Sequence, residues 1–380
     1  MKVVFPYIAQ THQIPHSLPI AAELAIQHPD WDIRLVCSSD DQERVVRRLV
    51  ALYPEARLAI DRFRVGALLR WHQRLVGAGI PEKTLTLFRN LGYFADVDAI
   101  VVPERTTLVL RKLHLLPASK PMIWTSHGAG DRAIGYAADL IRFDFQLLAG
   151  PKQVQRMRAD GCLREGRFHV GCYPKFDLVG RLDARRERLF ANDRPTVLYN
   201  PHFQPGLSSW PRDGYKVLDF FAQSKDWNLI FAPHIRMLDR EDPATLARLE
   251  RYRGLPHLRI DTGSDASIDM TYTQAADTYL GDVSSQIAEF MVRPRPCLFI
   301  NSHGVRWQGN PDYLCWELGP VIDTVEALGP ALAAAVASHG DWSERQRSYF
   351  RDTFDAEPDA IGRSAAAGAA AIAAFLQRQR

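Results

Sequence analysis

The chain has 380 residues, of which 46% are hydrophobic and 24% are charged, and its formal net charge is +3. This length exceeds the usual size of one domain, so we expect two. The nearly neutral charge gives no reason to expect nucleic acid as a partner. No apolar run approaches the roughly 20 residues of a membrane span, and five scattered cysteines without a CxxC pair argue against a disulfide framework or a zinc site. We therefore expect a soluble, cytoplasmic protein.

In the first half of the chain, short apolar runs alternate with helical patterns. Helices are expected at residues 18–27 and 152–159. Strands are expected at residues 2–7, 33–38, 98–102, 121–125, 145–149 and 168–170. This alternation predicts a parallel sheet with helices on both faces.

The segment 183–195 is charged and has no apolar periodicity, so we interpret it as a linker. The pattern of strands and helices then restarts. Strands are expected at residues 196–199, 228–232, 257–260, 277–280 and 296–300. An alanine-rich helix is expected at the C-terminal end, crossing back to brace the first domain.

The predicted fold class is therefore α/β, with two Rossmann-like, doubly wound parallel-sheet domains that face a cleft. We place the N-terminal domain at 1–185, the C-terminal domain at 195–360 and the terminal helix at 361–380. Ligands of such sheets bind at the carboxyl ends of strands.

Small hydroxyl residues follow one strand of the second half. The run Gly281-Asp282-Val283-Ser284-Ser285-Gln286 ends an apolar strand and precedes apolar residues at helical spacing. Ser284 and Ser285 therefore lie at a helix start, where free backbone N–H groups attract an anion. Simple helix capping by these serines is the alternative, since serine is a preferred N-cap.

Three histidines also follow predicted strands. His127 lies between a strand and the glycine-rich turn Gly128-Ala129-Gly130, and its neutral ring is suited to accept a proton near pH 7. His202 and His234 follow two strands of the second half. A metal site is disfavoured because neither HxH nor HxxxH spacing occurs among them. The HxxxH pair His12 and His16 follows the first strand, where it would line the acceptor side.

Five short motifs, in order from about residue 120 to 301, resemble the CDP-glycerol glycerophosphotransferase family, which includes the teichoic-acid polymerases and primases. The motifs are His127-Gly-Ala-Gly-Asp-Arg-Ala-Ile-Gly135, Gly171-Cys-Tyr-Pro-Lys-Phe-Asp177, Val197-Leu-Tyr-Asn-Pro-His-Phe203, Pro233-His234 and Asp282-Val-Ser-Ser285. The resemblance covers roughly half of the chain.

The resemblance implies a GT-B architecture and transfer of an alditol phosphate from a CDP-linked donor to a glycan or lipid-linked hydroxyl. By position it implies His127 as catalytic base and His234 as a second catalytic histidine. It also places Ser284 and Ser285 on the donor phosphates. Further donor contacts are expected from Gly128, Arg132, Asn200, His202, Arg236, Asp282 and Gln286. No cofactor and no obligatory metal is expected, because no Asp pair of DxD type follows a strand.

The chain departs from the family pattern at His202, Gln204 and Val283. These departures leave two alternatives open, which are a UDP-sugar-dependent GT-B glycosyltransferase or epimerase and a non-catalytic nucleotide-binding homologue. A third concerns location, because segment 62–75 mixes arginines with apolar residues. A basic amphipathic helix of this kind lies on anionic lipid, here the inner face of the plasma membrane, while packing on the first sheet is the alternative.

Overall fold

The computed structural model describes residues 1–64, 82–131, 136–183, 189–237 and 243–379. Its contacts divide the chain into two compact units. Unit 1 comprises 1–127, 136–181 and 362–380, and unit 2 comprises 128–135 and 182–361. The short segment 128–135 thus groups with unit 2, although the residues on either side of it belong to unit 1. None of the helices in the described ranges is long and apolar enough to cross a membrane.

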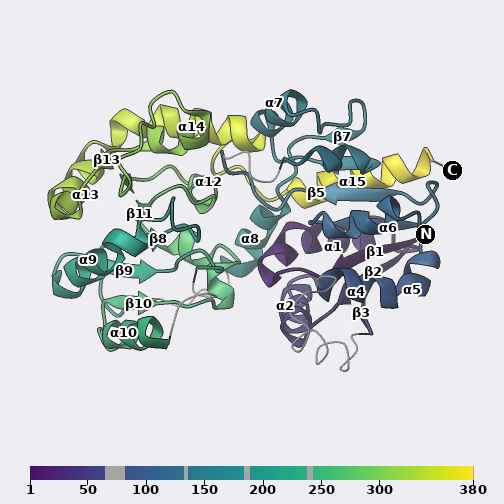
Figure 1. Cartoon of the computed structure of the whole chain (residues 1–380), viewed down its shortest axis with the longest axis horizontal. Helices are drawn as coiled ribbons and strands as arrows, with labels where there is room; N and C mark the ends of the chain where they lie inside the picture. The colour runs from purple at the N-terminus through teal and green to yellow at the C-terminus, as the bar shows by residue number, and fades with distance from the viewer. Residues whose placement is uncertain (65–81, 132–135, 184–188, 238–242, 380) are drawn as a thin grey trace. The chain divides into compact units, whose positions relative to one another are not determined.

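Unit 1 is built on a parallel sheet with the strand order β3-β2-β1-β4-β5-β6-β7 (Figure 1). The strands are β1 (Lys2–Tyr7), β2 (Asp32–Cys37), β3 (Ala59–Arg62), β4 (Ala99–Val102), β5 (Met122–Thr125), β6 (Phe145–Leu147) and β7 (Phe168–His169). Apolar residues fill both faces of the central strands, and Val3, Val4 and Phe5 of β1 are fully buried. Such burial on two faces is why these strands appear in the sequence as apolar runs.

Helices cover both faces of this sheet. They are α1 (Leu18–Gln27), α2 (Asp40–Val50), α4 (Glu82–Arg89), α5 (Leu91–Ala95), α6 (Val109–Lys112), α7 (Pro151–Ala159), α8 (Asp177–Asp183) and α15 (Ser364–Gln377), with 3-10 turns η1 (Thr11–His16), η2 (Thr106–Leu108), η3 (Ala138–Arg142) and η4 (Pro174–Phe176). The start of α2 shows why a helix begins at this point of the sequence. Ser39 is its N-cap, and the Ser39 hydroxyl accepts a hydrogen bond from the N–H of Gln42. Acidic residues occupy the first turn of α2 and arginines the last, and charges in these positions stabilise a helix through its dipole.

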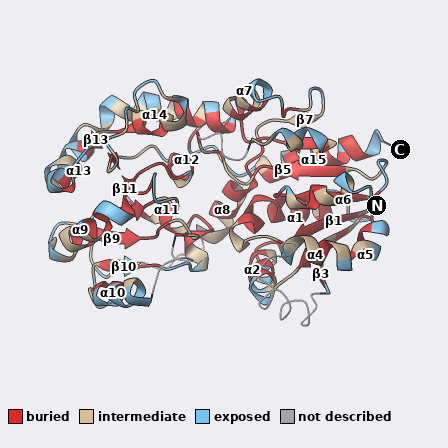
Figure 2. Cartoon of the chain, viewed as in Figure 1, coloured by how far each residue is buried: buried red, intermediate tan, exposed pale blue. Residues whose placement is uncertain are grey.

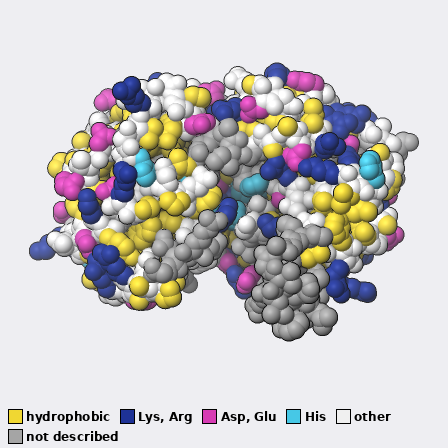
Figure 3. Space-filling view, in the orientation of Figure 1, with side chains coloured by type: hydrophobic (Ala, Val, Ile, Leu, Met, Phe, Trp, Pro, Cys, Tyr) yellow, Lys and Arg dark blue, Asp and Glu magenta, His cyan; other side chains and the backbone are white. Residues whose placement is uncertain are grey.

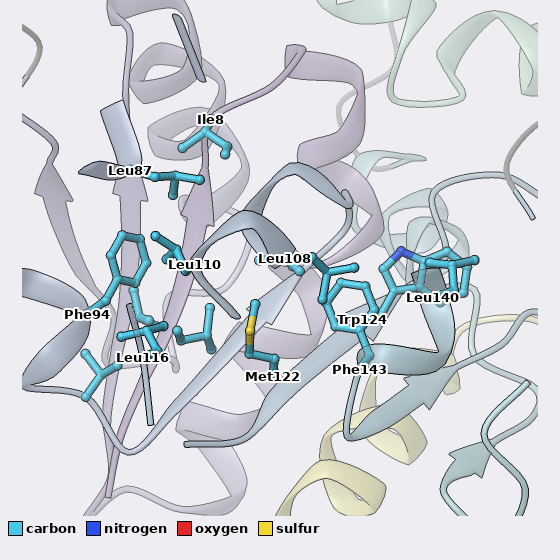
Figure 4. Packing of buried hydrophobic residues seen from close by; sticks show 14 of the residues in the cluster. Ile8, Leu87, Phe94, Leu108, Leu110, Leu116, Met122, Trp124, Leu140 and Phe143 are labelled. Carbon is cyan, nitrogen blue, oxygen red and sulfur yellow. The ribbon is translucent and has the colours of Figure 1, made fainter. Parts of the chain in front are cut away.

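One core of unit 1 lies between the sheet and helices α4, α5 and α6. Figure 4 shows Leu87, Phe94 and Leu110 from these helices packed toward Met122 and Trp124 of β5. The C-terminal helix α15 belongs to the same unit and packs against α1. The ring of Phe375 stacks on Phe145 with 4.8 Å between centroids. The predicted return of this helix to the first domain is therefore confirmed.

Unit 2 is a second parallel sheet, with the order β10-β9-β8-β11-β12-β13. Its strands are β8 (Thr196–Asn200), β9 (Asn228–Phe231), β10 (Leu258–Ile260), β11 (Thr278–Gly281), β12 (Cys297–Ile300) and β13 (Val321–Ile322). Its helices are α9 (Trp210–Gln223), α10 (Pro243–Arg253), α11 (Thr271–Ala275), α12 (Gln286–Phe290), α13 (Leu328–Ala337) and α14 (His339–Phe354), with 3-10 turns η6 (Asp265–Ser267), η7 (Pro311–Leu318) and η8 (Val325–Ala327).

Burial follows the same layered pattern in each unit. The strands of both sheets are buried, whereas the outer faces of helices such as α9, α10 and α13 are exposed (Figure 2). Two parallel sheets with helices on both sides confirm the predicted α/β class. Because parallel strands end at a common edge, the loops after them gather there, which positions the predicted site residues.

Candidate functional site

Unit 2 brings the loops after β8, β9 and β11 to one edge of its sheet. β8 has β9 on one side and β11 on the other, and all three run parallel. The chain proceeds from β8 outward to β10 and then returns to β11, so the direction of strand addition reverses beside β8. Ligands of open parallel sheets bind at the carboxyl ends of strands at such a reversal. The loops there carry His202, His234, Arg236 and the segment 282–286.

Asp282 joins two of these loops from inside the protein. Its carboxylate is fully buried and accepts four hydrogen bonds. Oδ1 accepts from the N–H groups of His202 (2.9 Å) and Val283 (2.8 Å), and Oδ2 accepts from the N–H (2.7 Å) and hydroxyl (3.0 Å) of Ser209. Burial raises the pKa of Asp282 to about 6, and four donors keep the carboxylate ionised at neutral pH. Asp282 therefore fixes the loops after β8 and β11 and leaves no surface of its own for a ligand.

Asn200 is equally enclosed. Its Nδ2 donates to the carbonyl oxygen of Ala232 at 2.6 Å, and its Oδ1 accepts from the Tyr279 hydroxyl at 3.5 Å. The side chain is fully buried and connects the ends of β8, β9 and β11. Direct donor contact by Asn200 and Asp282 stays a prediction, and the arrangement instead gives both a supporting role beneath the edge.

The ring of His234 has a defined hydrogen-bonding role. Its Nδ1 accepts a hydrogen bond from the backbone N–H of Arg236 at 3.2 Å, so in the neutral ring the proton lies on Nε2. Burial, with the nearby charge of Arg236, lowers the pKa of His234 to about 4. The ring is therefore neutral at pH 7, and its Nε2–H is a hydrogen-bond donor rather than a base.

His202 repeats this arrangement on the neighbouring loop. Its Nδ1 accepts from the backbone N–H of Gln204 at 3.1 Å, which again places the proton of a neutral ring on Nε2. The His202 and His234 ring centroids lie 5.8 Å apart, and Phe203 packs on His234 at 4.6 Å. The guanidinium of Arg236 lies 4.6 Å from the Phe203 ring centroid. One cation and two imidazole donors thus gather around Phe203.

The two serines differ in exposure. Ser284 is buried, and its hydroxyl accepts a 3.4 Å hydrogen bond from the N–H of Gln286, a local bond common for serine next to a helix start. Its contact with the donor phosphates stays a prediction. Ser285 is exposed and makes no side-chain cap. Gln286 is half-buried, and its Nε2 donates to the Ser267 carbonyl oxygen at 3.3 Å. Helix α12 has only five residues, so an anion at Ser285 would rely on local hydroxyl and N–H donors more than on a helix dipole.

The glycine-rich turn of the first motif lies against Ser285. A Cβ added to Gly130 would come within 3.1 Å of the Ser285 Cβ, which is tighter than most real contacts. The next residue, Asp131, accepts hydrogen bonds from the N–H of Cys315 (2.8 Å) and the hydroxyl of Tyr349 (3.0 Å). The turn is therefore fixed within unit 2 beside the serine loop. Arg132 lies outside the described residues.

In unit 1, His127 follows β5 at the carboxyl edge of the sheet. Its Nδ1 lies 2.5 Å from the carbonyl oxygen of Pro103, which can only accept, so Nδ1 carries the proton. The remaining lone pair of the neutral ring is then on Nε2, as a general base requires. Burial lowers the pKa of His127, the bond to Pro103 opposes this, and the charges of Arg105 and Lys83 lower the pKa further. The ring is therefore neutral at pH 7.

Glu104, beside Pro103, was not among the predicted site residues. Its buried carboxylate accepts hydrogen bonds from the N–H of Thr106 and from the N–H and hydroxyl of Thr107. It thereby holds the first N–H groups of η2 and fixes the turn that presents the Pro103 carbonyl to His127. The signal in the sequence was an acidic residue two positions after a buried strand and two positions before a Thr-Thr pair.

The pair His12 and His16 occupies η1, after β1 of the same sheet. His16 is buried, and its ring packs edge-on against Tyr173 at 5.1 Å. Burial lowers the pKa of His16 well below its usual value, and the charge of Lys175 acts in the same sense. Within the described ranges, no group of three or more His, Cys, Asp or Glu residues could hold a metal ion.

This architecture is that of a GT-B-type α/β protein with two Rossmann-like units. The solved structures that it matches include the wall teichoic acid polymerase TagF, with a TM-score of 0.67 and 15% identity over 100% of this chain and 89% of the other. A second TagF structure gives 0.68 at 14% identity over the same shares. The UDP-GlcNAc 2-epimerase from Neisseria meningitidis, bound to UDP-GlcNAc, gives 0.60 at 11% identity over the whole of both chains. These matches confirm the predicted fold class. No protein-family model and no curated protein matches the sequence.

Proposed function

We propose that this protein is a transferase that moves an alditol phosphate from a CDP-linked donor to a hydroxyl of a glycan or lipid-linked acceptor. The observation that carries the proposal is the opposite hydrogen bonding of two histidines. His127 donates from Nδ1 to Pro103 and keeps a lone pair on Nε2, whereas His234 accepts at Nδ1 and donates from Nε2. Transfer of this kind needs one base for the attacking hydroxyl and separate donors for the phosphates.

In the proposed reaction the acceptor hydroxyl oxygen attacks the β-phosphorus of the donor. The new O–P bond forms while the bond between that phosphorus and the bridging oxygen breaks, and CMP leaves with the electron pair. Nε2 of His127 takes the hydroxyl proton. General-base help of this kind contributes on the order of 10²–10⁴ in rate.

Charge on the leaving CMP has to be offset, because phosphoryl transfer depends mainly on positioning and electrostatics. We assign this role to the Nε2–H groups of His202 and His234, the guanidinium of Arg236 and the hydroxyl of Ser285. These groups follow β8, β9 and β11 and so lie at a common edge of unit 2. The assignment needs no metal ion, and turnover that survives EDTA would agree with it.

The experiment that tests the proposal is a titration of the full chain with CMP and with UMP by calorimetry, followed by turnover of CDP-glycerol with a polyol-phosphate acceptor. Tighter binding of CMP and release of CMP are expected. A ligand at about 100 times its Kd also stabilises the fold by about 2.7 kcal/mol, which a thermal melt detects. Binding of UMP that is equal to or tighter than that of CMP would contradict the CDP-linked donor.

A UDP-sugar-dependent reaction is the second candidate, and the structural likeness to a UDP-GlcNAc 2-epimerase over the full chain favours it. A single assay of turnover with both donors distinguishes the two candidate functions. Turnover of UDP-GlcNAc without turnover of CDP-glycerol would replace the first proposal by the second. Binding of either nucleotide without turnover would identify a non-catalytic homologue.

Ser285 is proposed as a phosphate ligand and not as a nucleophile, because a hydroxyl without an adjacent base attacks poorly. Ser285→Ala should lower kcat/KM by roughly one to two orders of magnitude, the equivalent of one charge-assisted hydrogen bond. Mass spectrometry after incubation with donor alone should find unmodified protein. A phospho-alditol adduct on Ser285 would contradict the single displacement.

A further inference from the structure

The two units carry charges of opposite sign. Unit 1 contains 27 lysines and arginines against 17 aspartates and glutamates, a net charge of +10, whereas unit 2 contains 20 against 27, a net charge of −7. The nearly neutral total of +3 conceals this difference. A net charge of +10 makes unit 1 attractive to an anionic surface.

In the described part of unit 1, three large hydrophobic side chains are exposed, and all three lie close in sequence to exposed basic residues. Leu113 is 53% exposed, Leu115 40% and Ile141 45%. Lys112 and Arg142, their neighbours in sequence, are also exposed. In the described part of the chain, the other large hydrophobic side chains of comparable exposure are Leu246 and Val336, both in unit 2. We call Lys112, Leu113, His114, Leu115, Ile141 and Arg142 the amino-edge patch.

The two segments of the amino-edge patch are tied together by hydrogen bonds. The guanidinium of Arg111 donates to the Arg142 carbonyl oxygen at 2.9 Å, and Lys112 pairs with Asp139 at 2.7 Å. The side chains of Leu110 and Leu116 point into the core (Figure 4), whereas Leu113 and Leu115 between them do not. The outward direction of Leu113 and Leu115 is therefore a property of an ordered turn.

That turn has a defined backbone. The N–H of Leu115 donates to the Leu110 carbonyl oxygen at 2.8 Å and closes helix α6. His114 has a φ of 54°, in the left-handed region that a non-glycine residue rarely adopts.

Figure 3 shows hydrophobic side chains exposed among lysines and arginines on the part of unit 1 where α6 and α15 are labelled in Figure 1.

The amino-edge patch lies at the opposite end of the sheet from His127. Leu113 and Leu115 precede β5, and Ile141 and Arg142 precede β6, so both segments lie at the amino ends of parallel strands. Arg167, which precedes β7, adds positive charge at the same end, whereas Arg111 and Arg164 both pair there with the carboxylate of Asp144. His127 follows β5 at the carboxyl end. A ligand on this patch would therefore leave the carboxyl edge of the sheet uncovered.

We propose that the amino-edge patch docks unit 1 on the surface of an anionic lipid bilayer. The leucine and isoleucine side chains would enter the headgroup boundary, and the basic residues would meet lipid phosphates, which is how peripheral proteins combine apolar and electrostatic contact. An apolar protein partner lacks the negative charge that the +10 of unit 1 favours. The docking needs no nucleotide and is therefore independent of the proposed reaction.

The test is co-sedimentation of the full chain with vesicles, either of phosphatidylcholine alone or of phosphatidylcholine with an equal part of phosphatidylglycerol. Wild type should sediment with the anionic vesicles only, and rising salt should weaken binding. Leu113→Asp with Ile141→Asp should lower the partition coefficient by about tenfold or more. Arg142→Glu should lower it by about five- to thirtyfold, since each unit of charge near the surface is worth about a factor of five and this reversal changes the charge by two units.

The matched control is Leu246→Asp with Val336→Asp, which likewise replaces two aliphatic side chains by aspartate at similarly exposed positions of unit 2. This control should bind vesicles like wild type. Should the aspartate variant of the patch lose its circular dichroism spectrum, the milder pair Leu113→Ser and Leu115→Ser replaces it. Failure of wild type to bind, equal binding to neutral vesicles, or an equal loss in the control would each overturn the proposal.

Discussion

The imidazole rings of His127 in unit 1 and His234 in unit 2 both follow a parallel strand, and both are neutral at pH 7, yet their hydrogen bonds are reversed. The Nδ1 of His127 faces a carbonyl oxygen and must donate. The Nδ1 of His234 faces an N–H group and must accept. A single backbone atom at Nδ1 thus decides whether Nε2 is a base or a donor. The pKa alone would not distinguish them, because burial lowers it in both.

The largest expected effect is at His127. His127→Ala should lower kcat by about 10²–10⁴ while leaving the Kd of CMP unchanged, because the base acts on the acceptor hydroxyl. His127→Gln should be as inactive as His127→Ala, since an amide nitrogen has no lone pair that takes a proton. Single-turnover kinetics and calorimetry measure the two quantities. More than about a tenth of wild-type activity in either variant would exclude the base role.

Replacing His234 should cost less activity than replacing His127, and glutamine should restore part of the loss. His234→Ala should weaken both donor binding and rate by roughly ten- to a hundredfold, the size of one hydrogen bond to a charged group. His234→Gln should recover part of this loss, because the amide Nε2 donates where the imidazole Nε2–H did. The measurement is kcat and KM for the donor in wild type and both variants. If the glutamine variant were as impaired as the alanine variant, donation by Nε2 would not be the role of His234.

The glycine pair of the first motif offers a sharper comparison within one turn. Gly130→Ala should destabilise the fold by about 1–3 kcal/mol, because its Cβ would press on Ser285 at 3.1 Å. Gly128→Ala should leave stability unchanged, since a Cβ there meets no atom within 4 Å. Urea unfolding of both variants measures the difference. Equal destabilisation would show that the close approach of Gly130 to the serine loop is not what requires glycine.

The smallest expected effect concerns acid stability. The pKa of His234 is lowered from 6.5 to about 4, so between these values the unfolded chain binds a proton that the folded chain does not. Stability should therefore fall as pH falls through this window. His234→Gln should lose less stability than wild type between neutral pH and about pH 5 by urea unfolding. An identical pH dependence in the two proteins would mean that His234 is not neutral in the folded state.

Much of the fold could be predicted because buried parallel strands appear as apolar runs. The expected strand at 2–7 and helix at 18–27 coincide with β1 (Lys2–Tyr7) and α1 (Leu18–Gln27). Strand β3 (Ala59–Arg62) was not predicted, since it is an edge strand in which Asp61 and Arg62 interrupt any apolar run. The two-residue β13 is too short to leave a pattern. The predicted basic helix at 62–75 falls largely outside the described residues.

The candidate site could be predicted only in part. The three histidines were recognisable because each follows a strand, and topology then brings such positions to the carboxyl edge of a sheet. Their proton positions were not predictable, because the partner of His127 lies 24 residues away at Pro103. The burial of Asn200 and Asp282 was not predictable either, because it depends on neighbouring strands and loops that are distant in sequence. A polar residue after a strand can hold neighbouring loops together as readily as it can contact a ligand, and the sequence does not distinguish the two roles.

The Asp282 carboxylate has a consequence for anyone who would redesign the loops at this edge of unit 2. The Asp282 side chain accepts hydrogen bonds from Ser209 and His202 of the loop after β8 and from Val283 of its own loop. The two loops therefore depend on each other and have to be exchanged together. A graft that replaces only residues 201–209 must reproduce the N–H groups at 202 and 209 or leave a charged oxygen buried without partners. Loop libraries for this protein should therefore vary residues 201–209 and 283–286 together, with Asp282 kept constant.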